Sequence, residues 1–450
     1  MAALTHVPMP ARHAARRPAP RRAVAAAALW AAVATASACG GAPGVSLRAA
    51  EVLRAPIEGG ATPMFAIAPG GDRTVAWVAA PGGGSDGRLF TSTNGAAPSE
   101  LRDPLGGIEP HGEAPPKVGY APDGSLYALY AVGRLEAGRR FPFTTLRVAR
   151  STDGGRTWSE PRTVTGDSVP GSRNFHALHV AGDGSLYVAW LEARGGHASA
   201  TYLTRSTDGG ATWRATVRVD TSESCPCCRT AITTAPDGTL YLAWRTVLPG
   251  QVRDIVVARS ADQGVTWERP VRVHADNFVF EGCPHAGPSL QADSAGRLHI
   301  AWWTGREGAA GVYYARSDDG GRTFRAPVAL GVAPFARPAH PQVALAGDGG
   351  VVVAWDDART APPRVLVRRS TDGGASFAPA VTASDTSVAA TFPVLALHGD
   401  SITLAWAQQS RASLEHAEHS RPDMKDPSAV MPLPSVGAQV VVVRRGRMGS

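Results

Sequence analysis

One octapeptide recurs five times and constrains the fold of this chain more than any other feature. It reads Ser-Thr-Asp-Gly-Gly-Arg-Thr-Trp at residues 151–158, and its relatives follow at intervals of 53 to 57 residues, beginning at Ser151, Ser206, Ser260, Ser317 and Ser370. Each copy follows an apolar run and an arginine, which places it at a turn between two strands. Its Asp and Ser side chains can accept backbone hydrogen bonds, its glycine tolerates positive φ, and its closing Trp or Phe can pack under the turn. The repeat is therefore a folding device and performs no reaction by itself.

A second repeat in the sequence indicates how many structural units the chain contains. An apolar run that ends in Ala-Trp or an equivalent pair occurs seven times at spacings of 51 to 60 residues, at Trp77, Tyr130, Trp190, Trp244, Trp302, Trp355 and Trp406. Each unit reads as strand, turn, Trp-ended strand, loop, third strand, octapeptide turn and fourth strand. Four-stranded units of this period indicate an all-β propeller, with seven blades favoured and six as the alternative.

The first and last units are irregular. The first has only Ser92-Thr-Asn-Gly where the octapeptide would fall, and the last has none in residues 410–426. We expect residues 51–57 or 439–443 to complete the last blade, so that residues 51–450 form one propeller. The basic segment 444–447 is expected to be a solvated tail.

The octapeptides resemble the Asp-box, or BNR repeat, of the sialidase superfamily. The resemblance implies that each lies between the third and fourth strands of a blade, on the face opposite an active site. It covers most of residues 50–410. Non-enzymatic members carry the motif as well, so it implies the fold and little about activity.

The N-terminal segment has the order of an export signal. Its apolar run, residues 23–38, follows five arginines, namely Arg12, Arg16, Arg17, Arg21 and Arg22. Ala36-Ser-Ala-Cys39 is similar to a bacterial lipoprotein cleavage site. We therefore expect residues 1–38 to be a signal peptide, Cys39 to be lipidated, residues 39–50 to be a linker, and the protein to be anchored to a bacterial membrane in the periplasm or at the cell surface. Ordinary secretion is the alternative.

Composition suits a turn-rich globular protein. The 450 residues are 44% hydrophobic and 18% charged, with 50 Gly and 36 Pro. The formal net charge of +7 falls to +2 when the five leader arginines are removed. Nothing in this balance favours a nucleic-acid partner.

The cysteines form the first candidate site. Four remain beyond Cys39, and they are Cys225, Cys227, Cys228 and Cys283. Cys225 and Cys283 each lie nineteen residues before the Trp position of their own unit, so their loops are equivalent on neighbouring blades. A Cys225–Cys283 disulfide is the commoner interpretation in an exported protein. The alternative is a copper or zinc site built from the thiolates and His285, with His176 on the same face. Arg229 follows Cys228 where a covalent haem site would need His.

Four arginines form the second candidate site. Each lies four residues beyond the Trp position, and they are Arg134, Arg194, Arg306 and Arg359. Guanidinium groups converging on a pit would suit a carboxylate or sulfate ligand. Alternatively each braces its own blade, since Glu192, Glu307 and the pair Asp356-Asp357 stand beside three of them. Further ligand-binding candidates on the same face are Arg245, Arg173, His176 and His340.

The sialidase resemblance implies an arginine triad, a Tyr nucleophile paired with Glu, and an Asp acid/base. The early Arg-Ile-Pro signature is absent, and no Tyr follows Tyr314. We therefore expect a surface-anchored propeller that binds a glycan or another anionic ligand. The alternatives are a glycosidase of the exo-sialidase type that uses Asp356, Asp357 or Glu113, and a metal or thiol protein centred on the cysteines.

Overall fold

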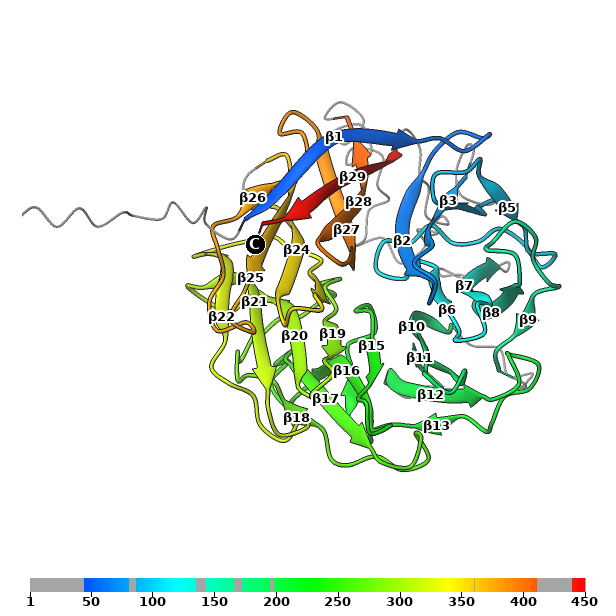
Figure 1. Ribbon diagram of the computed structural model, residues 1–450. Helices are drawn as coiled ribbons and strands as arrows, with labels where there is room; N and C mark the ends of the chain where they lie inside the picture. The colour runs from blue at the N-terminus through cyan, green and yellow to red at the C-terminus, as the bar shows by residue number, and fades with distance from the viewer. Residues whose placement is uncertain are drawn as a thin grey trace, which may run out of the picture. The chain divides into compact units, whose positions relative to one another are not determined.

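Seven antiparallel sheets follow one another along the chain and form a ring (Figure 1). The computed structural model describes residues 44–80, 86–134, 143–165, 172–194, 198–359, 361–410 and 439–449. The ring confirms the β-propeller and its seven blades. The expected signal peptide and Cys39 lie outside the described residues. Within the described part of the chain, no helix is long and apolar enough to span a bilayer.

The blades take their strands in chain order. Blades 1 to 3 consist of β2 (Ala61–Ile67), β3 (Arg73–Ala79), β4 (Arg88–Thr93) and β5 (Ser99–Leu101); β6 (Lys117–Tyr120), β7 (Leu126–Arg134), β8 (Phe143–Ser151) and β9 (Arg162–Thr163); and β10 (Asn174–Val180), β11 (Leu186–Glu192), β12 (Ala200–Ser206) and β13 (Val217–Arg218).

Blade 4 carries one additional short strand. Blades 4 to 6 consist of β14 (Glu223–Ser224), β15 (Ala231–Thr234), β16 (Leu240–Val247), β17 (Ile255–Ser260) and β18 (Val271–Arg272); β19 (Ser289–Ala292), β20 (Leu298–Thr304), β21 (Ala310–Ser317) and β22 (Val328–Ala333); and β23 (Gln342–Leu345), β24 (Val351–Asp357), β25 (Arg364–Ser370) and β26 (Val381–Thr382).

Blade 7 closes the ring with strands from both ends of the chain. Its order is β27 (Ala389–His398), β28 (Ser401–Gln409), β29 (Val440–Met448) and β1 (Val45–Leu53). β1 and β29 lie side by side (Figure 1), and their antiparallel register pairs Val45 with Met448. Both segments that we expected as alternatives therefore contribute.

Two boundaries at this closure differ from the sequence expectation. β1 begins at Val45, inside the expected linker 39–50, because it is needed as the fourth strand of blade 7. The basic segment 444–447 belongs to β29, and Arg444 donates to the carbonyl oxygens of Arg48 and Ala383. The segment is part of the closing sheet and not a solvated tail.

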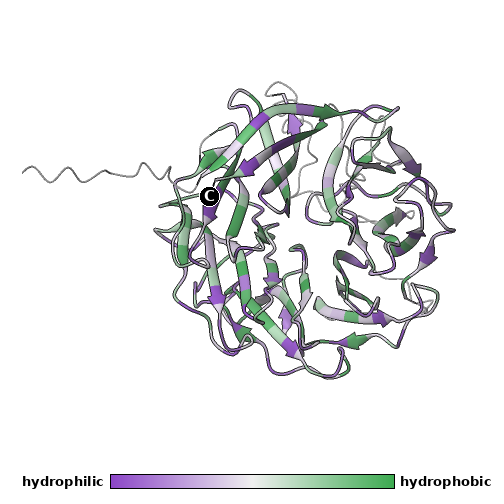
Figure 2. Ribbon diagram, in the orientation of Figure 1, coloured by the Kyte–Doolittle hydropathy of each residue, from purple (hydrophilic) through white to green (hydrophobic). Residues whose placement is uncertain are grey.

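The Trp position lies on the second strand of every blade, and its side chain is almost completely buried in all seven. Trp244, for example, packs in a cluster that joins Leu203 of blade 3 to Val256 of blade 4. Figure 2 shows hydrophobic residues along the strands of each blade. Burial of a ring of this size contributes about 3–5 kcal/mol to stability, measured as the cost of truncation to Ala. The Trp repeat thus supplies the core between the blades.

The octapeptides form the turns between the third and fourth strands, as the resemblance implied. In blade 3 the Ser206 hydroxyl accepts the Gly210 N–H at 2.9 Å, and Asp208 accepts both the N–H and the hydroxyl of Thr212, at 2.9 and 2.5 Å. Gly210 has a φ of 84°, a conformation that favours glycine. Trp213 then packs against the buried cluster shared by blades 2 and 3. Each turn therefore fastens its blade to the preceding one.

We expect the Asp-box carboxylates to make stability depend on acid pH. The Thr212 hydroxyl and N–H hold the pKa of Asp208 at about 2, below its ordinary value of 3.8. Because the folded pKa is the lower one, the stabilisation is complete above about pH 4 and is lost as the pH falls toward 2. Asp208→Asn should lower the urea midpoint at pH 5, and the difference from the wild type should shrink at pH 3.

Asp400→Asn, in an exposed turn outside the octapeptides, serves as the control. A difference between Asp208→Asn and the wild type that stays constant from pH 5 to pH 3 would contradict this account.

Candidate functional site

The face opposite the Asp-box turns gathers loops from all seven blades. Neighbouring strands are antiparallel, so the loop entering each first strand and the loop leaving each second strand open on the same side. We call this side the loop face. The site candidates of the sequence that lie within the described residues are on this side, and Arg173, His176 and Arg245 are among those buried beneath its surface.

Glu113 joins four blades near the first strands. Its side chain is 1% exposed. One carboxylate oxygen accepts the N–H groups of Arg229, at 3.2 Å, and Gly287, at 2.9 Å, and the other accepts the Arg229 guanidinium at 3.3 Å. The His340 Nε2 lies 3.7 Å from the second oxygen. These partners come from blades 4, 5 and 6, whereas Glu113 precedes β6 of blade 2.

Gly287 has no room for a side chain. A Cβ at this position would lie 2.3 Å from the carbonyl oxygen of Arg229. The close approach brings the Gly287 N–H to Glu113, which explains a glycine at this point of the loop.

His340 and Asp356 form the second half of this network. The His340 N–H and Nδ1 donate to the two oxygens of Asp356, at 2.5 and 2.6 Å, and Nε2 donates to the carbonyl of His285 at 3.0 Å. Asp356 also accepts the Phe392 N–H at 3.1 Å. Burial disfavours the charged imidazole, but the carboxylate of Asp356 outweighs burial and raises the pKa of His340. We call Glu113, Arg229, His340 and Asp356 the hub network.

Three titratable groups surround the hub network. Burial, followed by the charge of Arg229, lowers the pKa of Lys117 to about 7. Burial also lowers the pKa of His111 to about 4 and that of His176 to about 3. His176 is therefore a neutral, buried side chain at neutral pH and does not face a ligand.

Sequence reasoning missed Arg229, Lys117 and His111. A usable signal was present, because Arg229, Gly287 and His340 each lie fifteen residues before the Trp position of their own unit. In the sequence analysis, positions relative to the Trp were compared for the cysteines alone. The same comparison for Arg229, Gly287 and His340 would have placed these three residues at the same level of adjacent blades. His111 lies nineteen residues before Tyr130, in the register of Cys225 and Cys283, whereas Lys117 lies thirteen residues before Tyr130 and has no equivalent among the candidates.

The carboxylates considered for catalysis are all bound inside the fold. Glu113 and Asp356 belong to the hub network, and their side chains are 1% and 4% exposed. Asp357 accepts two bonds from the Arg359 guanidinium, at 2.6 and 3.1 Å. None of the three presents an open carboxylate oxygen pair to a substrate in this arrangement.

The arginines beyond the Trp position pair with local carboxylates. Arg194 bonds Glu192 at 2.8 Å and lies over the Tyr202 ring at 4.5 Å, and Arg306 lies over Tyr313 at 4.9 Å. The Arg306 partner is Asp276, at 3.8 Å, and not the Glu307 that we expected from its proximity in sequence. The bracing arrangement is therefore present.

These guanidinium groups still reach solvent. The side chains of Arg194, Arg306 and Arg359 are 30–32% exposed. Arg134 ends β7 and is exposed.

Arg245 has a different environment. It is 1% exposed and donates to the carbonyl oxygens of Ala286, Arg253 and Trp303. Arg173 is also internal and pairs with Glu192 at 3.3 Å. Both brace loops from within instead of facing a ligand.

The four cysteines cluster with His285. The Cys225 sulfur lies 3.4 Å from that of Cys228 and 3.8 Å from that of Cys227. The donor atoms of Cys227, Cys283 and His285 also lie within 4.8 Å of one another. Cys227 thus belongs to two sets of three potential metal ligands.

No disulfide joins these cysteines, and all four are free thiols. Cys283 lies beside Cys227, while Cys225 faces Cys228, so the structure does not show the expected Cys225–Cys283 pair. Hydrogen bonds from Cys227 and Cys228, followed by the charges of Arg245 and Arg253, lower the pKa of Cys225. The hydrogen bond with Cys225 raises the pKa of Cys227, and burial raises that of Cys228, so Cys225 is the buried thiol placed to be a thiolate.

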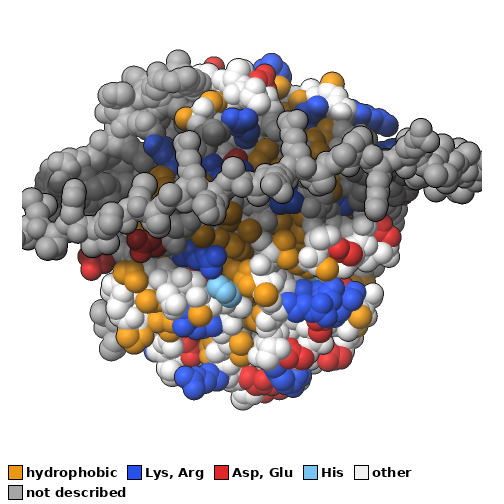
Figure 3. Space-filling view, turned by 90° about the vertical axis from the view of Figure 1, so that its left-hand side faces the viewer, with side chains coloured by type: hydrophobic (Ala, Val, Ile, Leu, Met, Phe, Trp, Pro, Cys, Tyr) orange, Lys and Arg blue, Asp and Glu red, His pale blue; other side chains and the backbone are white. Residues whose placement is uncertain are grey.

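Exposed hydrophobic side chains gather on the loop face. Four of the six large exposed ones in the described residues lie in loops that enter a first strand, namely Leu105, Val279, Phe280 and Phe335. Figure 3 views the rim over β22 and β26, where basic, acidic and hydrophobic side chains are interspersed. Phe335, at 78%, is the most exposed of these side chains.

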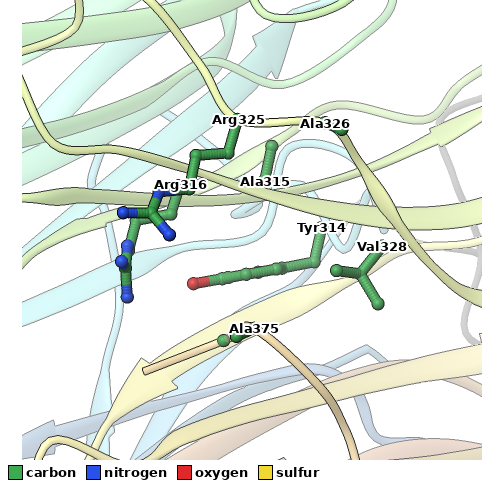
Figure 4. A pocket seen from close by; sticks show the side chains of 8 residues that line it. Tyr314, Ala315, Arg316, Arg325, Ala326, Val328 and Ala375 are labelled. Atoms are coloured by element: carbon green, nitrogen blue, oxygen red, sulfur yellow. The ribbon is translucent and has the colours of Figure 1, made fainter. Parts of the chain in front are cut away.

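Two hollows lie at the Asp-box side of the ring. A pocket of about 210 Å³ lies between β21 and the Asp-box of blade 6, where Arg316 and Arg325 stand side by side next to the Tyr314 ring (Figure 4). Asp318 pairs with both arginines. A hollow of about 530 Å³ is lined by the inner turns of blades 3, 4 and 5. Neither contains a residue of the hub network or the cysteine cluster.

Glu113→Gln should destabilise the protein by about 3–5 kcal/mol, because it leaves the buried guanidinium of Arg229 without its charge partner. Urea unfolding at equilibrium measures the loss. Asp318→Asn breaks a partly exposed ion pair and should cost less than about 1 kcal/mol. Equal losses in the two variants would contradict the assignment of Glu113 as a structural anchor.

Comparisons with known proteins agree with this architecture. A family model described as a BNR repeat-like domain matches residues 109–278 and 184–424, which confirms the resemblance inferred from the octapeptides. No functionally curated protein matches the sequence.

Solved structures share the fold at low sequence identity. A protein of unknown function from Dyadobacter fermentans DSM 18053 has a TM-score of 0.52 and 17% identity, over 90% of this chain and 100% of that chain. An ulvan lyase of polysaccharide lyase family PL25, bound to -[GlcA(1-4)Rha3S]-, has a TM-score of 0.53 and 12% identity, over 82% and 99%. The Hadza microbial sialidase Hz136 has a TM-score of 0.46 and 17% identity, over 73% and 74%. Such identities show a common fold alone.

Proposed function

The chain belongs to the BNR repeat-like family, and from that premise we propose that it binds an anionic glycan on its loop face without a sialidase mechanism. The observation that carries the proposal is the internal pairing of every candidate catalytic carboxylate, beside partly exposed arginine and aromatic side chains on the same face. The sugar is held by surface contacts and is not cleaved.

The tyrosines support the absence of a sialidase nucleophile. The hydroxyls of Tyr120, Tyr130 and Tyr313 bond Thr74, Asp103 and the Ala309 carbonyl. The Tyr314 hydroxyl bonds His299. The Tyr202 ring lies between Trp190 and Arg194. None of these contacts involves Glu113, the carboxylate that a Tyr nucleophile would need as its partner.

We place the glycan over blades 5 and 6, on a surface made of Phe280, Arg306, Phe335 and Arg359. Arg359 donates to the Val332 carbonyl at 3.3 Å, three residues before Phe335. Arg306 lies beside Asp276, four residues before Phe280. We call these four residues the loop-face patch.

The chemistry of the loop-face patch suits an acidic sugar. Exposed aromatic rings offer the apolar face on which a pyranose packs, and guanidinium forks donate two bonds to a carboxylate or sulfate. The ulvan lyase that shares the fold is bound to a saccharide that contains a glucuronate and a sulfated rhamnose. We therefore propose uronate-containing or sulfated oligosaccharides as the ligand class.

On a glycan array, the full chain should retain uronate-containing or sulfated oligosaccharides more strongly than neutral ones. Phe335→Ala and Arg306→Ala should each weaken binding about tenfold, which corresponds to about 1.4 kcal/mol for the loss of one good contact. Added salt should weaken binding further, because the ion pairs are partly exposed. Val265→Ala removes another exposed hydrophobic side chain, from an Asp-box turn, and should change nothing.

A uniformly blank array would count decisively against the proposal. Turnover of a fluorogenic sialoside that disappears in Asp356→Asn and Asp357→Asn would replace the binder with the glycosidase alternative.

We also propose that the protein is exported and lipid-anchored through Cys39. The support is the order of five arginines, an apolar run and Ala-Ser-Ala-Cys in the leader. In bacteria that express the full chain, labelled palmitate should enter the wild type and not Cys39→Ala, and the variant should leave the membrane fraction. Mass spectrometry that finds an unmodified N-terminus downstream of Cys39 would contradict the anchor.

A further inference from the structure

We propose that the cysteine cluster is a cuprous ion site in which Cys227 is a bridging thiolate between two three-ligand positions. This site shares no residue with the loop-face patch, although Arg253 beside the cluster also donates to the carbonyl oxygen of Phe280, at 2.6 Å. The proposal does not rest on glycan binding. One position consists of Cys225, Cys227 and Cys228, and the other of Cys227, Cys283 and His285.

The spacing of the donors fits metal coordination. Two sulfurs bound to one ion at about 2.3 Å are about 3.8 Å apart in a tetrahedral arrangement and slightly farther apart in a trigonal one. The Cys225 sulfur lies 3.8 Å from Cys227 and 3.4 Å from Cys228. The first set therefore needs only small movements to enclose an ion.

The number of donors favours Cu(I) over Zn(II). Structural zinc takes four ligands, which must all lie close together. Among the described residues, the two sets contain three donors each, and no fourth donor completes either one. Thiolates are the soft ligands that cuprous copper prefers, and Cu(I) is stable with three of them.

The charges around the cluster fit a pair of cuprous ions. Four thiolates and two Cu(I) ions leave a net charge of about −2, which needs compensation in a buried setting. The Arg253 guanidinium donates to the Cys225 sulfur at 3.3 Å. Arg245 is fully buried and bonds the Arg253 carbonyl at 2.7 Å. These two cations supply the opposite charge.

The two positions differ in exposure, which suggests a direction of loading. Cys225, Cys227 and Cys228 are buried, whereas Cys283 and His285 are exposed on the loop face. An incoming Cu(I) ion meets Cys283 and His285 first and is passed inward through Cys227, which both positions share. Each thiol that coordinates copper releases its proton to solvent, and the oxidation state of the metal does not change.

The backbone holds the donors in place without metal. The Cys225 N–H donates to the Arg245 carbonyl at 2.8 Å. The His285 carbonyl accepts from His340 of the hub network at 3.0 Å. The loops are therefore pre-formed by the structural network beside them, which lowers the cost of ordering them around an ion.

The test is an anaerobic titration of the reduced full chain with Cu(I), added as its acetonitrile complex against the chelator bathocuproine disulfonate. All proteins carry Cys39→Ala, which leaves four thiols. We expect two copper ions per chain. Cys225→Ser and Cys283→Ser should each retain one, and Cys227→Ser should retain none, because it alone belongs to both positions.

Two further variants separate the cluster from general effects. His285→Ala should reduce the stoichiometry from two to one, whereas His398→Ala, an exposed histidine on the Asp-box side, should leave it at two. Arg253→Met should keep two ions but weaken their retention about 10- to 100-fold, as expected for a group that supports a ligand.

Thiol protection keeps the proposal testable if Cys227→Ser does not fold. In the copper-loaded wild type, all four thiols should resist alkylation by iodoacetamide, as mass spectrometry detects. Alkylation of any of the four, tighter binding of a single Zn(II) than of Cu(I), or one full copper equivalent in folded Cys227→Ser would overturn the bridged arrangement.

Discussion

The charge of Glu113 at the inner ends of four blades is the constraint on which the rest of the loop face depends. A buried carboxylate must be paired, and this one draws Arg229, Gly287 and His340 toward it from three other blades. The loops that carry Arg229 and Gly287 also carry the cysteines and His285. An internal ion network therefore occupies the inner part of the loop face.

In this arrangement, three groups of residues that the sequence could not tell apart have different roles. Glu113 and Asp356 hold the blades, the arginines beyond the Trp positions brace the strands yet keep about a third of their side-chain surface exposed, and the thiols form a soft donor cluster. The groups that remain for the ligand chemistry we propose therefore lie around the hub network and not within it. The glycan binding that we propose over blades 5 and 6 and the copper binding that we propose near blades 4 and 5 both follow from that arrangement.

The parts of the structure that depend on local sequence could be predicted. The octapeptide turns and the Trp positions recur at regular intervals along the sequence. They therefore predicted the strand order, the blade count and the equivalence of the two cysteine loops. Contacts between blades could not be predicted in the same way. Arg306 pairs with Asp276 and not with Glu307, and Cys283 lies beside Cys227 and not Cys225, because loop conformation and not residue spacing decides which neighbour is reached. The register of Arg229 and His340 was legible, but nothing in it revealed that Glu113 would be their common partner.

The most direct test is a crystal structure of the protein soaked with a sulfated, uronate-containing oligosaccharide. The account predicts sugar density over Phe280, Arg306, Phe335 and Arg359, with the bonds between Glu113 and Arg229 unchanged. Density between the hub residues, with Arg229 drawn away from Glu113 onto the sugar, would contradict it, because the network would then be a substrate site and not an anchor.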